Sequence, residues 1–121
     1  MTGYLYIALT VLLTVYGQLI IKWQVGQAGV LPIGLWEKIL FLLQICLNPW
    51  VASGFFAAFL AALCWMAAIT RMELSHAYPF VGSTFVFVLI GSALFFSEAL
   101  TPLKMAGTAL IVLGIIVASQ G

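Results

Sequence analysis

The sequence contains very little charge. Only 6% of its 121 residues are Asp, Glu, Lys or Arg, whereas 65% are hydrophobic, and the mean hydropathy is +1.26. A soluble domain usually carries about 25% charged residues, so this chain has too few to cover a water-exposed surface. The composition therefore excludes a soluble globular domain. It predicts an integral membrane protein, for which lipid is the main solvent of the outer face.

Groups that would support other functions are equally scarce. The net charge is only +1, and the basic residues are scattered singly, so there is no basic patch for nucleic acid. The two cysteines, Cys46 and Cys64, lie in apolar surroundings without a CxxC or Cys/His group, and we expect them to pack as small hydrophobes. No nucleophile, general base or metal cluster is visible. The sequence predicts a protein that is not an enzyme and that needs no metal or cofactor.

What the sequence does contain is a set of long apolar stretches. The first has no basic region and no cleavage motif, so we expect a retained span and not a signal peptide. A transmembrane helix needs about 20 mostly apolar residues. The predicted fold is therefore all-α, a polytopic membrane protein with four transmembrane helices. We expect one domain, residues 1–121, with spans at about 3–22, 49–69, 76–96 and 102–119.

The segment between the first two spans divides into two parts. Residues 23–34 contain three Gly and one Pro without clear periodicity, and they are expected to form a loop. Residues 35–47 are apolar but too short to span. Their polar positions, with Glu37 and Gln44, fall on one narrow stripe, which favours a helix lying in the membrane interface. The alternative is one long span over residues 35–69.

Two Pro-containing pairs mark helix starts. Asn48 followed by Pro49, and Thr101 followed by Pro102, each combine a favoured N-cap residue with a favoured first helical residue. In the third span Pro79 precedes a Gly/Ser/Thr cluster, which can loosen a membrane helix. In the fourth span, Gly107 and Gly114 lie two turns apart on one face and favour a close helix contact.

A polar stripe runs along the first span. Its members recur at a strict spacing of four, which places them on one helix face: Thr10, Thr14, Gln18 and Lys22. In hydrocarbon an unsatisfied amide or hydroxyl costs several kcal/mol. The stripe must therefore face other protein, a water-filled cavity or a polar substrate.

The charges give a weak indication of orientation. Loops one and three hold three lysines, whereas the opposite side holds Arg71 and both termini, so the positive-inside rule favours both termini outside. A chain with so small a bias can insert both ways and form antiparallel dimers.

Four motifs recur at the ends of the predicted spans: GQLIIK, NPWVASG, LSHAYPF and SEALTPLKMAGTALIVLGI. They resemble the drug/metabolite transporter superfamily, and in particular its four-helix branch similar to small multidrug resistance proteins. The resemblance covers nearly the whole chain. Drug-exporting members carry a glutamate in the middle of the first span, where this chain has Thr14. Because no Asp or Glu lies inside any span, proton-coupled drug export is not expected.

The motifs are more similar to flippase-like, EamA-like members, which include the aminoarabinose-undecaprenyl phosphate flippase subunits. The long segment of residues 23–48 also favours this branch. The resemblance implies a multi-pass protein of the bacterial inner membrane that moves a polyprenyl-phosphate-linked sugar between leaflets. It also implies a partner, either a second copy in an antiparallel homodimer or a related chain in a heterodimer.

Seven residues are candidates for substrate binding: Lys22, Gln18, Thr14, Arg71, Tyr78, Ser83 and Trp65. Lys22 suits a lipid phosphate but could be an interfacial anchor, and Arg71 suits a phosphate at the opposite face but could simply pair with Glu73. Gln18 suits a sugar or phosphodiester, or else an interhelical hydrogen bond.

The other candidates have similar alternatives. Thr14 suits substrate contact or a bond to its own helix. Tyr78 and Ser83 would line a cavity, and Trp65 would stack on a sugar or pack. His76 is expected to start a helix at the interface, and Glu98 to pair with Lys104 or cap backbone donors.

Three functions remain open at this point. The leading one is flipping of a polyprenyl-phosphate-linked sugar or a related anionic glycolipid. The second is export of a small molecule or drug, and the third is an accessory role beside a glycosyltransferase or transporter.

Overall fold

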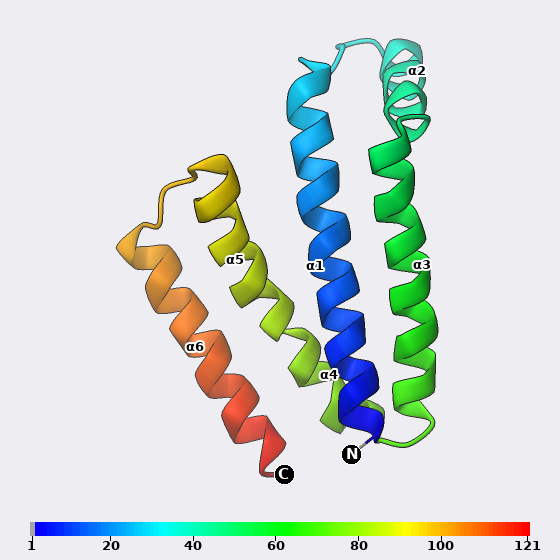
Figure 1. Cartoon of the computed structure of the whole chain (residues 1–121). Coiled ribbons are helices and arrows are strands. Elements are labelled where there is room, and N and C mark those ends of the chain that lie inside the picture. Colours follow the sequence, from blue (N-terminus) through cyan, green and yellow to red (C-terminus); the bar gives the residue numbers. More distant parts are fainter. Residues whose placement is uncertain (1) are drawn as a thin grey trace.

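The computed structural model describes residues 2–121 and contains helices without strands in that range (Figure 1). The helices are α1 (Thr2–Ala28), α2 (Leu35–Cys46), α3 (Pro49–Ile69), α4 (Leu74–Val81), α5 (Ser83–Phe96) and α6 (Pro102–Ser119). Four helical stretches are long and apolar enough to cross a membrane: α1, α3, α4 with α5, and α6. The predicted all-α fold with four transmembrane helices is confirmed.

Helix α1 stands at the centre, with α3 on one side and α5 on the other (Figure 1). The α1–α3 contact is close because it is built from small residues: Gly17 and Gly54 face each other, and Thr10 lies against the Ala61 carbonyl. Small residues let membrane helices approach until their backbones touch. On the α5 side, Gly91 accommodates Leu19 of α1.

Helix α1 extends beyond the predicted span. It continues to Ala28, so the loop expected at residues 23–34 is confined to residues 29–34, and that part of the prediction was wrong. Two contacts support the extra turns: the Asn48 amide donates to Gln24 Oε1 at 3.0 Å, and the Trp23 and Trp50 rings pack edge to face. The helix ends where Gly29 adopts a φ of 100°, a left-handed conformation typical of a helix C-terminus.

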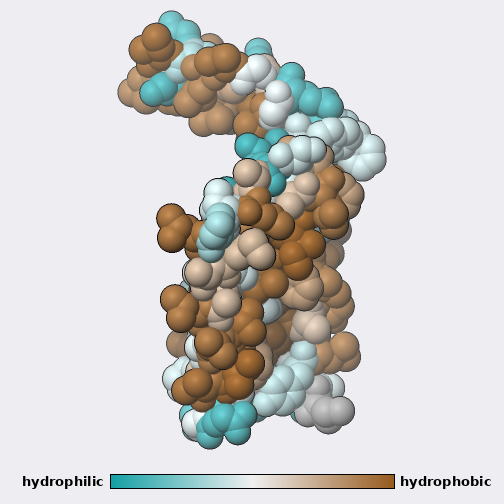
Figure 2. Space-filling model, turned by 90° about the vertical axis from the view of Figure 1, so that its left-hand side faces the viewer, coloured by the Kyte–Doolittle hydropathy of each residue, from teal (hydrophilic) through white to brown (hydrophobic). Residues whose placement is uncertain are grey.

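Helix α2 is separate from α3 and projects sideways from the bundle (Figure 2). The break at residues 47–48 excludes one long span over residues 35–69. Asn48 caps α3 by accepting from the Trp50 N–H at 2.8 Å, and Pro49 is its first residue, as predicted. No residue of α2 is buried, and it exposes large apolar side chains such as Trp36 and Leu43. An exposed apolar arm beside a membrane bundle is consistent with an interfacial helix.

The third span is broken between α4 and α5. Gly82 lies at the break, where its N–H donates to the Pro79 carbonyl and its own carbonyl accepts from Phe85, both at 3.0 Å. A Cβ at Gly82 would lie 3.5 Å from Ile115, so α6 packs closely against the chain at this position. Thr101 caps α6 as predicted, accepting from the Lys104 N–H at 3.2 Å.

The buried core is small and lies where α1, α3 and α4 meet. It contains Ile7, Val11, Ala68 and Ala77, with Trp65 packed against it. The outer faces carry exposed Leu, Phe, Ile and Val side chains, and Figure 2 shows hydrophobic residues along most of the bundle's height. This distribution matches a protein whose outer surface contacts lipid.

Candidate functional site

A groove opens between α1, α3 and α4, about halfway along the bundle. Its volume is about 260 Å³. The lining residues are Thr10 and Thr14 from α1, Ala58, Ala61, Ala62 and Trp65 from α3, and Tyr78 and Val81 from α4. Three predicted site residues, Thr14, Trp65 and Tyr78, therefore share one groove although they come from three helices.

The groove combines an aromatic wall with hydroxyl groups. The rings of Trp65 and Tyr78 meet edge to face, with centroids 5.8 Å apart. Thr10 is committed to the fold, because its hydroxyl donates to the Tyr6 carbonyl at 2.8 Å and also reaches the Ala61 carbonyl at 3.4 Å. Thr14 lines the same groove, and its hydroxyl makes no hydrogen bond within residues 2–121.

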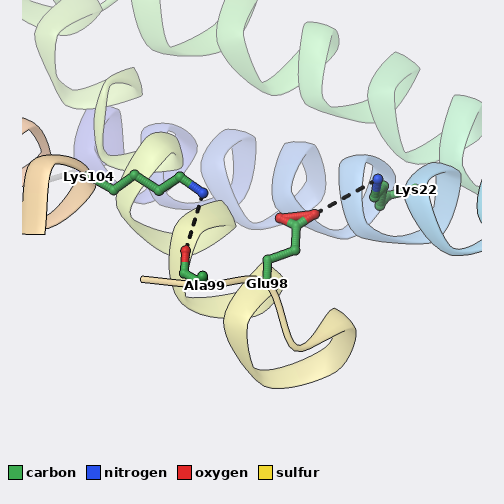
Figure 3. A network of polar contacts seen from close by, with 4 residues as sticks. All are labelled: Lys22, Glu98, Ala99 and Lys104. Carbon is green, nitrogen blue, oxygen red and sulfur yellow. Dashed lines mark hydrogen bonds and ion pairs between the residues drawn. The ribbon is translucent and has the colours of Figure 1, made fainter. Parts of the chain in front are cut away.

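The polar stripe continues from the groove toward one end of α1. Gln18 is exposed and forms no hydrogen bond with any described residue. One turn further, the Lys22 ammonium lies 3.8 Å from a Glu98 carboxylate oxygen, and the two side chains are 60% and 41% exposed (Figure 3). An exposed pair at this distance contributes at most about 1 kcal/mol, so Glu98 holds the Lys22 ammonium only weakly.

Local backbone geometry explains how Glu98 comes to face Lys22. Helix α5 ends at Phe96, and the next residue, Ser97, adopts a left-handed conformation with a φ of 54°. The Glu98 N–H donates to the Ser92 carbonyl at 3.3 Å. The expectation that Glu98 pairs with Lys104 was wrong: the Lys104 ammonium donates instead to the Ala99 carbonyl at 3.2 Å (Figure 3).

Arg71 lies at the opposite end of the bundle, in a different cavity. That cavity, of about 580 Å³, is also lined by Tyr4, Glu73 and His76. Arg71 and Glu73 form no ion pair, since Lys22–Glu98 is the single one within residues 2–121. The alternative interpretation of Arg71, a local ion pair with Glu73, is therefore not observed.

Ser83 is separated from the Trp65–Tyr78 groove. It lines another groove, between α1 and the α4–α5 break, together with Phe80 and Phe87. Its hydroxyl donates to the Phe80 carbonyl at 2.7 Å. Its substrate role stays a prediction, without support from the neighbouring candidates.

The candidates thus lie at successive heights beside α1, although some belong to other helices. Tyr4 and Lys22 are 18 residues apart, which is about 27 Å at 1.5 Å per residue and close to the hydrocarbon thickness of a bilayer, about 30 Å. Arg71 and Glu73 lie at the Tyr4 end of this distance, and Lys22 and Glu98 lie at the other end. The neutral polar groups lie between the two ends. Such an arrangement can hold an anionic group at either face and hydrogen-bond to it on the way.

A cluster of amides near α2 was not anticipated from the sequence. Gln24, Gln27, Gln44 and Asn48 line a cavity of about 310 Å³ where α1, α2 and α3 meet. The sequence signal was present in the polar stripe of residues 35–48. It could not be connected with Gln24, because residues 23–34 were expected to be a loop.

Comparisons with known proteins agree with one another. The model of the EamA-like transporter family matches residues 1–120. The chain is 33% identical to the probable 4-amino-4-deoxy-L-arabinose-phosphoundecaprenol flippase subunit ArnF of Photorhabdus laumondii, over 95% of this chain and 94% of the relative. It is 31% identical to the ArnF protein of Serratia proteamaculans, over 95% and 90%. It is also 33% identical to the ArnE subunit of Aeromonas salmonicida, over 91% and 90%. No solved structure matches the chain significantly.

Proposed function

The chain belongs to the EamA-like transporter family, and from this membership we propose that it flips a polyprenyl-phosphate-linked sugar between the leaflets of the bacterial inner membrane. The relatives are named as flippase subunits for such a lipid, and they match this chain almost end to end. The observation that carries the proposal is the series along α1, with a cation at each end and a neutral polar groove between them.

Each part of the series has a chemical role in this proposal. Lys22 binds the lipid phosphate at one face as a point charge, and Arg71 binds it at the other. Gln18 and Thr14 donate hydrogen bonds to the sugar phosphate between the faces. The Trp65 and Tyr78 rings offer an aromatic surface to the sugar ring. The groove is open at its side, so the prenyl chain stays in lipid while the head group passes.

Proton exchange is not part of the proposed mechanism. The three acidic residues lie in connections or in the interfacial helix: Glu37, Glu73 and Glu98. A carrier that exchanges protons for cations requires an ionisable group within the membrane. In this mechanism the recognised charge is that of the lipid phosphate, which Lys22 and Arg71 bind at the two faces.

The proposal is tested by measuring flipping directly. In proteoliposomes containing a fluorescent polyprenyl-phosphate sugar, wild-type protein should transfer the label between leaflets, and Lys22→Ala should slow transfer at least about tenfold. Lys38→Ala, which removes a cation from α2, is the matched control and should leave the rate unchanged.

Two results would count against this function. Full activity of a folded Lys22→Ala protein would remove the role of Lys22 in the path. Uptake of soluble organic cations by the same proteoliposomes, without any lipid transfer, would favour the small-molecule exporter instead.

A second chain is the proposed partner. The relatives carry two different subunit names, and this chain matches both kinds, which supports assembly with a copy or with a related chain. Helix α6 has a free face for that contact, since nothing within the described chain lies within 4 Å of a Cβ at Gly107 or Gly114. Gly107 and Gly114 lie at equal distances from the middle of α6, so in an antiparallel pair Gly107 of one copy lies at the depth of Gly114 of the other. Cysteine cross-linking of Gly107→Cys in one copy to Gly114→Cys in the other, both lacking the native cysteines, should capture that dimer. A monomer in native membranes would contradict it.

A further inference from the structure

The amide-lined cavity where α1, α2 and α3 meet contains none of the transport candidates. Its volume is about 310 Å³, and its polar lining consists of four neutral amides: Gln24, Gln27, Gln44 and Asn48. Phe41 and Ile45 add apolar surface, and no charged residue of the described chain lines the cavity. A lining of this kind does not select a charge, so a ligand must be recognised there by hydrogen bonds and by shape.

The hydrogen bonds already formed around this cavity engage acceptors and leave donors. The Asn48 amide donates to Gln24 Oε1 at 3.0 Å, and Asn48 Oδ1 accepts from the Trp50 N–H at 2.8 Å. Gln24 is only 7% exposed, yet its Nε2 forms no hydrogen bond within residues 2–121. A side-chain amide nitrogen carries two N–H donors, and buried donors without a partner are costly. The cavity therefore favours a ligand that supplies hydrogen-bond acceptors.

Helix α2 contributes a further donor. Gln44 borders the same cavity, and its amide forms no hydrogen bond within the described part of the chain. The amides of Gln24 and Gln44 therefore present N–H groups to one cavity from two different helices. An uncharged ligand with two acceptors could bind both helices at once.

The cavity lies at the depth of the membrane interface. Gln24 follows Tyr4 by 20 residues, which is about 30 Å along α1 and matches the thickness of the hydrocarbon core. Next to it, the Trp23 and Trp50 rings pack edge to face with centroids 5.7 Å apart, and Trp is enriched where hydrocarbon meets the head groups. At this depth the uncharged acceptors of a bilayer are the ester carbonyls that join the acyl chains to glycerol.

We propose that this cavity binds the glycerol diester segment of a bilayer phospholipid. The ester carbonyls accept from the amides of Gln24 and Gln44, the glycerol backbone packs on Phe41 and Ile45, and the acyl chains continue into the surrounding lipid. The lipid connects α2 to α1, two helices that share no hydrogen bond within residues 2–121. Because the lining is neutral, the site does not select the head group. The proposal does not depend on the transport function.

The linkage of the lipid gives a direct test. A diether phospholipid has the same head group and chains of the same length as the diester, but it lacks the carbonyl oxygens. The whole protein, in a polyether detergent without carbonyl groups, is titrated with diester and with diether phosphatidylglycerol, and native mass spectrometry measures each Kd. We expect the diester to bind at least about threefold more tightly, because the diether leaves the amide donors unpaired. Phosphatidylcholine should give the same ratio.

Three Gln→Leu substitutions locate the effect. Gln24→Leu should reduce the ratio of the two Kd values to about one, and Gln44→Leu, which breaks no hydrogen bond within residues 2–121, should reduce it to about half. Comparing the two linkages within each variant cancels any general gain in lipid binding from the added apolar surface. Gln120→Leu makes the same change at the opposite end of the bundle (Figure 1). It is the matched control and should leave the ratio unchanged.

The other outcomes would overturn the site. Equal affinity of the wild type for the two linkages would do so, and so would a preference for the diester that persists in the folded amide variants. If circular dichroism shows that Gln24→Leu does not fold, Gln44→Leu decides the test alone. A preference for phosphatidylglycerol over phosphatidylcholine that is the same for both linkages would mean that the head-group charge is recognised instead of the ester carbonyls.

Discussion

Gly17 of α1 and Gly54 of α3 bring the two helix backbones into direct contact. A Cβ on Gly17 would lie 3.0 Å from the Gly54 carbonyl oxygen, and a Cβ on Gly54 would lie 3.4 Å from that of Gly17. Thr14 lies about one turn before Gly17, and Ala58 about one turn after Gly54, so this contact sets the spacing of the groove walls.

Replacing Gly17 should therefore destabilise the bundle. Gly17→Ala forces the backbones apart and should lower the free energy of unfolding by about 1 to 2 kcal/mol, typical of an overpacked contact. Gly26→Ala is the control in the same helix, because a Cβ there meets nothing within 4 Å. Unfolding in detergent, followed by circular dichroism, measures both. Equal stability of the two variants would mean that the contact is not tight.

The Lys22–Glu98 pair should contribute little to stability. Both side chains are exposed to solvent, and the Lys22 ammonium and the Glu98 carboxylate oxygen are 3.8 Å apart, so Lys22→Gln and Glu98→Gln should each change the free energy of unfolding by less than about 1 kcal/mol. The same unfolding assay measures this. A larger loss for Lys22→Gln would mean that any loss of flipping in that variant reflects the fold.

Two threonines on one face of α1 should respond differently to loss of their hydroxyl. Thr10→Val removes a buried donor to the Tyr6 carbonyl and should cost about 1 kcal/mol of stability. Thr14→Val removes a hydroxyl that makes no hydrogen bond within residues 2–121, so stability should be nearly unchanged while flipping slows. Unfolding and lipid-transfer assays on both variants check the contrast. The reverse pattern would place Thr14 in the structural framework.

Asn48 has two separable roles. Its side chain caps α3 by accepting from the Trp50 N–H, and its amide donates to Gln24. Asn48→Ala loses both bonds and should cost about 2 kcal/mol, whereas Asn48→Asp keeps the cap and should cost about half as much. Thermal unfolding of the two variants measures the difference. Equal losses would assign all of the effect to the contact with Gln24.

Local features of the fold could be predicted from the sequence. The starts of α3 and α6 depend on a cap and a proline that are adjacent in the chain, so the patterns at Asn48–Pro49 and Thr101–Pro102 are sufficient. The end of α1 could not be predicted in the same way. Its last turns are supported by Gln24 and Trp23 contacting α3, and such tertiary support overrides the glycines of the local sequence.

The candidate site was predictable to a similar degree. Helical spacing identified the stripe that contains Thr14 and Lys22, and residue chemistry identified Trp65 and Tyr78, which line the Thr14 groove. The pairing of Lys22 with Glu98 required the left-handed turn at Ser97, which no spacing rule indicates. The separation of Ser83 from the groove agrees with its spacing of five residues from Tyr78, which places the two side chains about 140° apart around a helix.

The helices differ in length, and this difference relates the protein to the thickness of its membrane. The 27 residues of α1 extend about 40 Å, beyond a hydrocarbon core of about 30 Å, whereas the 18 residues of α6 extend about 27 Å. A helix of this length tilts or extends into the lipid head-group layer, and its C-terminal end is the one that contacts the apolar arm α2. Hydrophobic mismatch costs a fraction of a kcal/mol per Å. In a thicker bilayer the C-terminal turns of α1, including Lys22, would therefore lie deeper in the membrane.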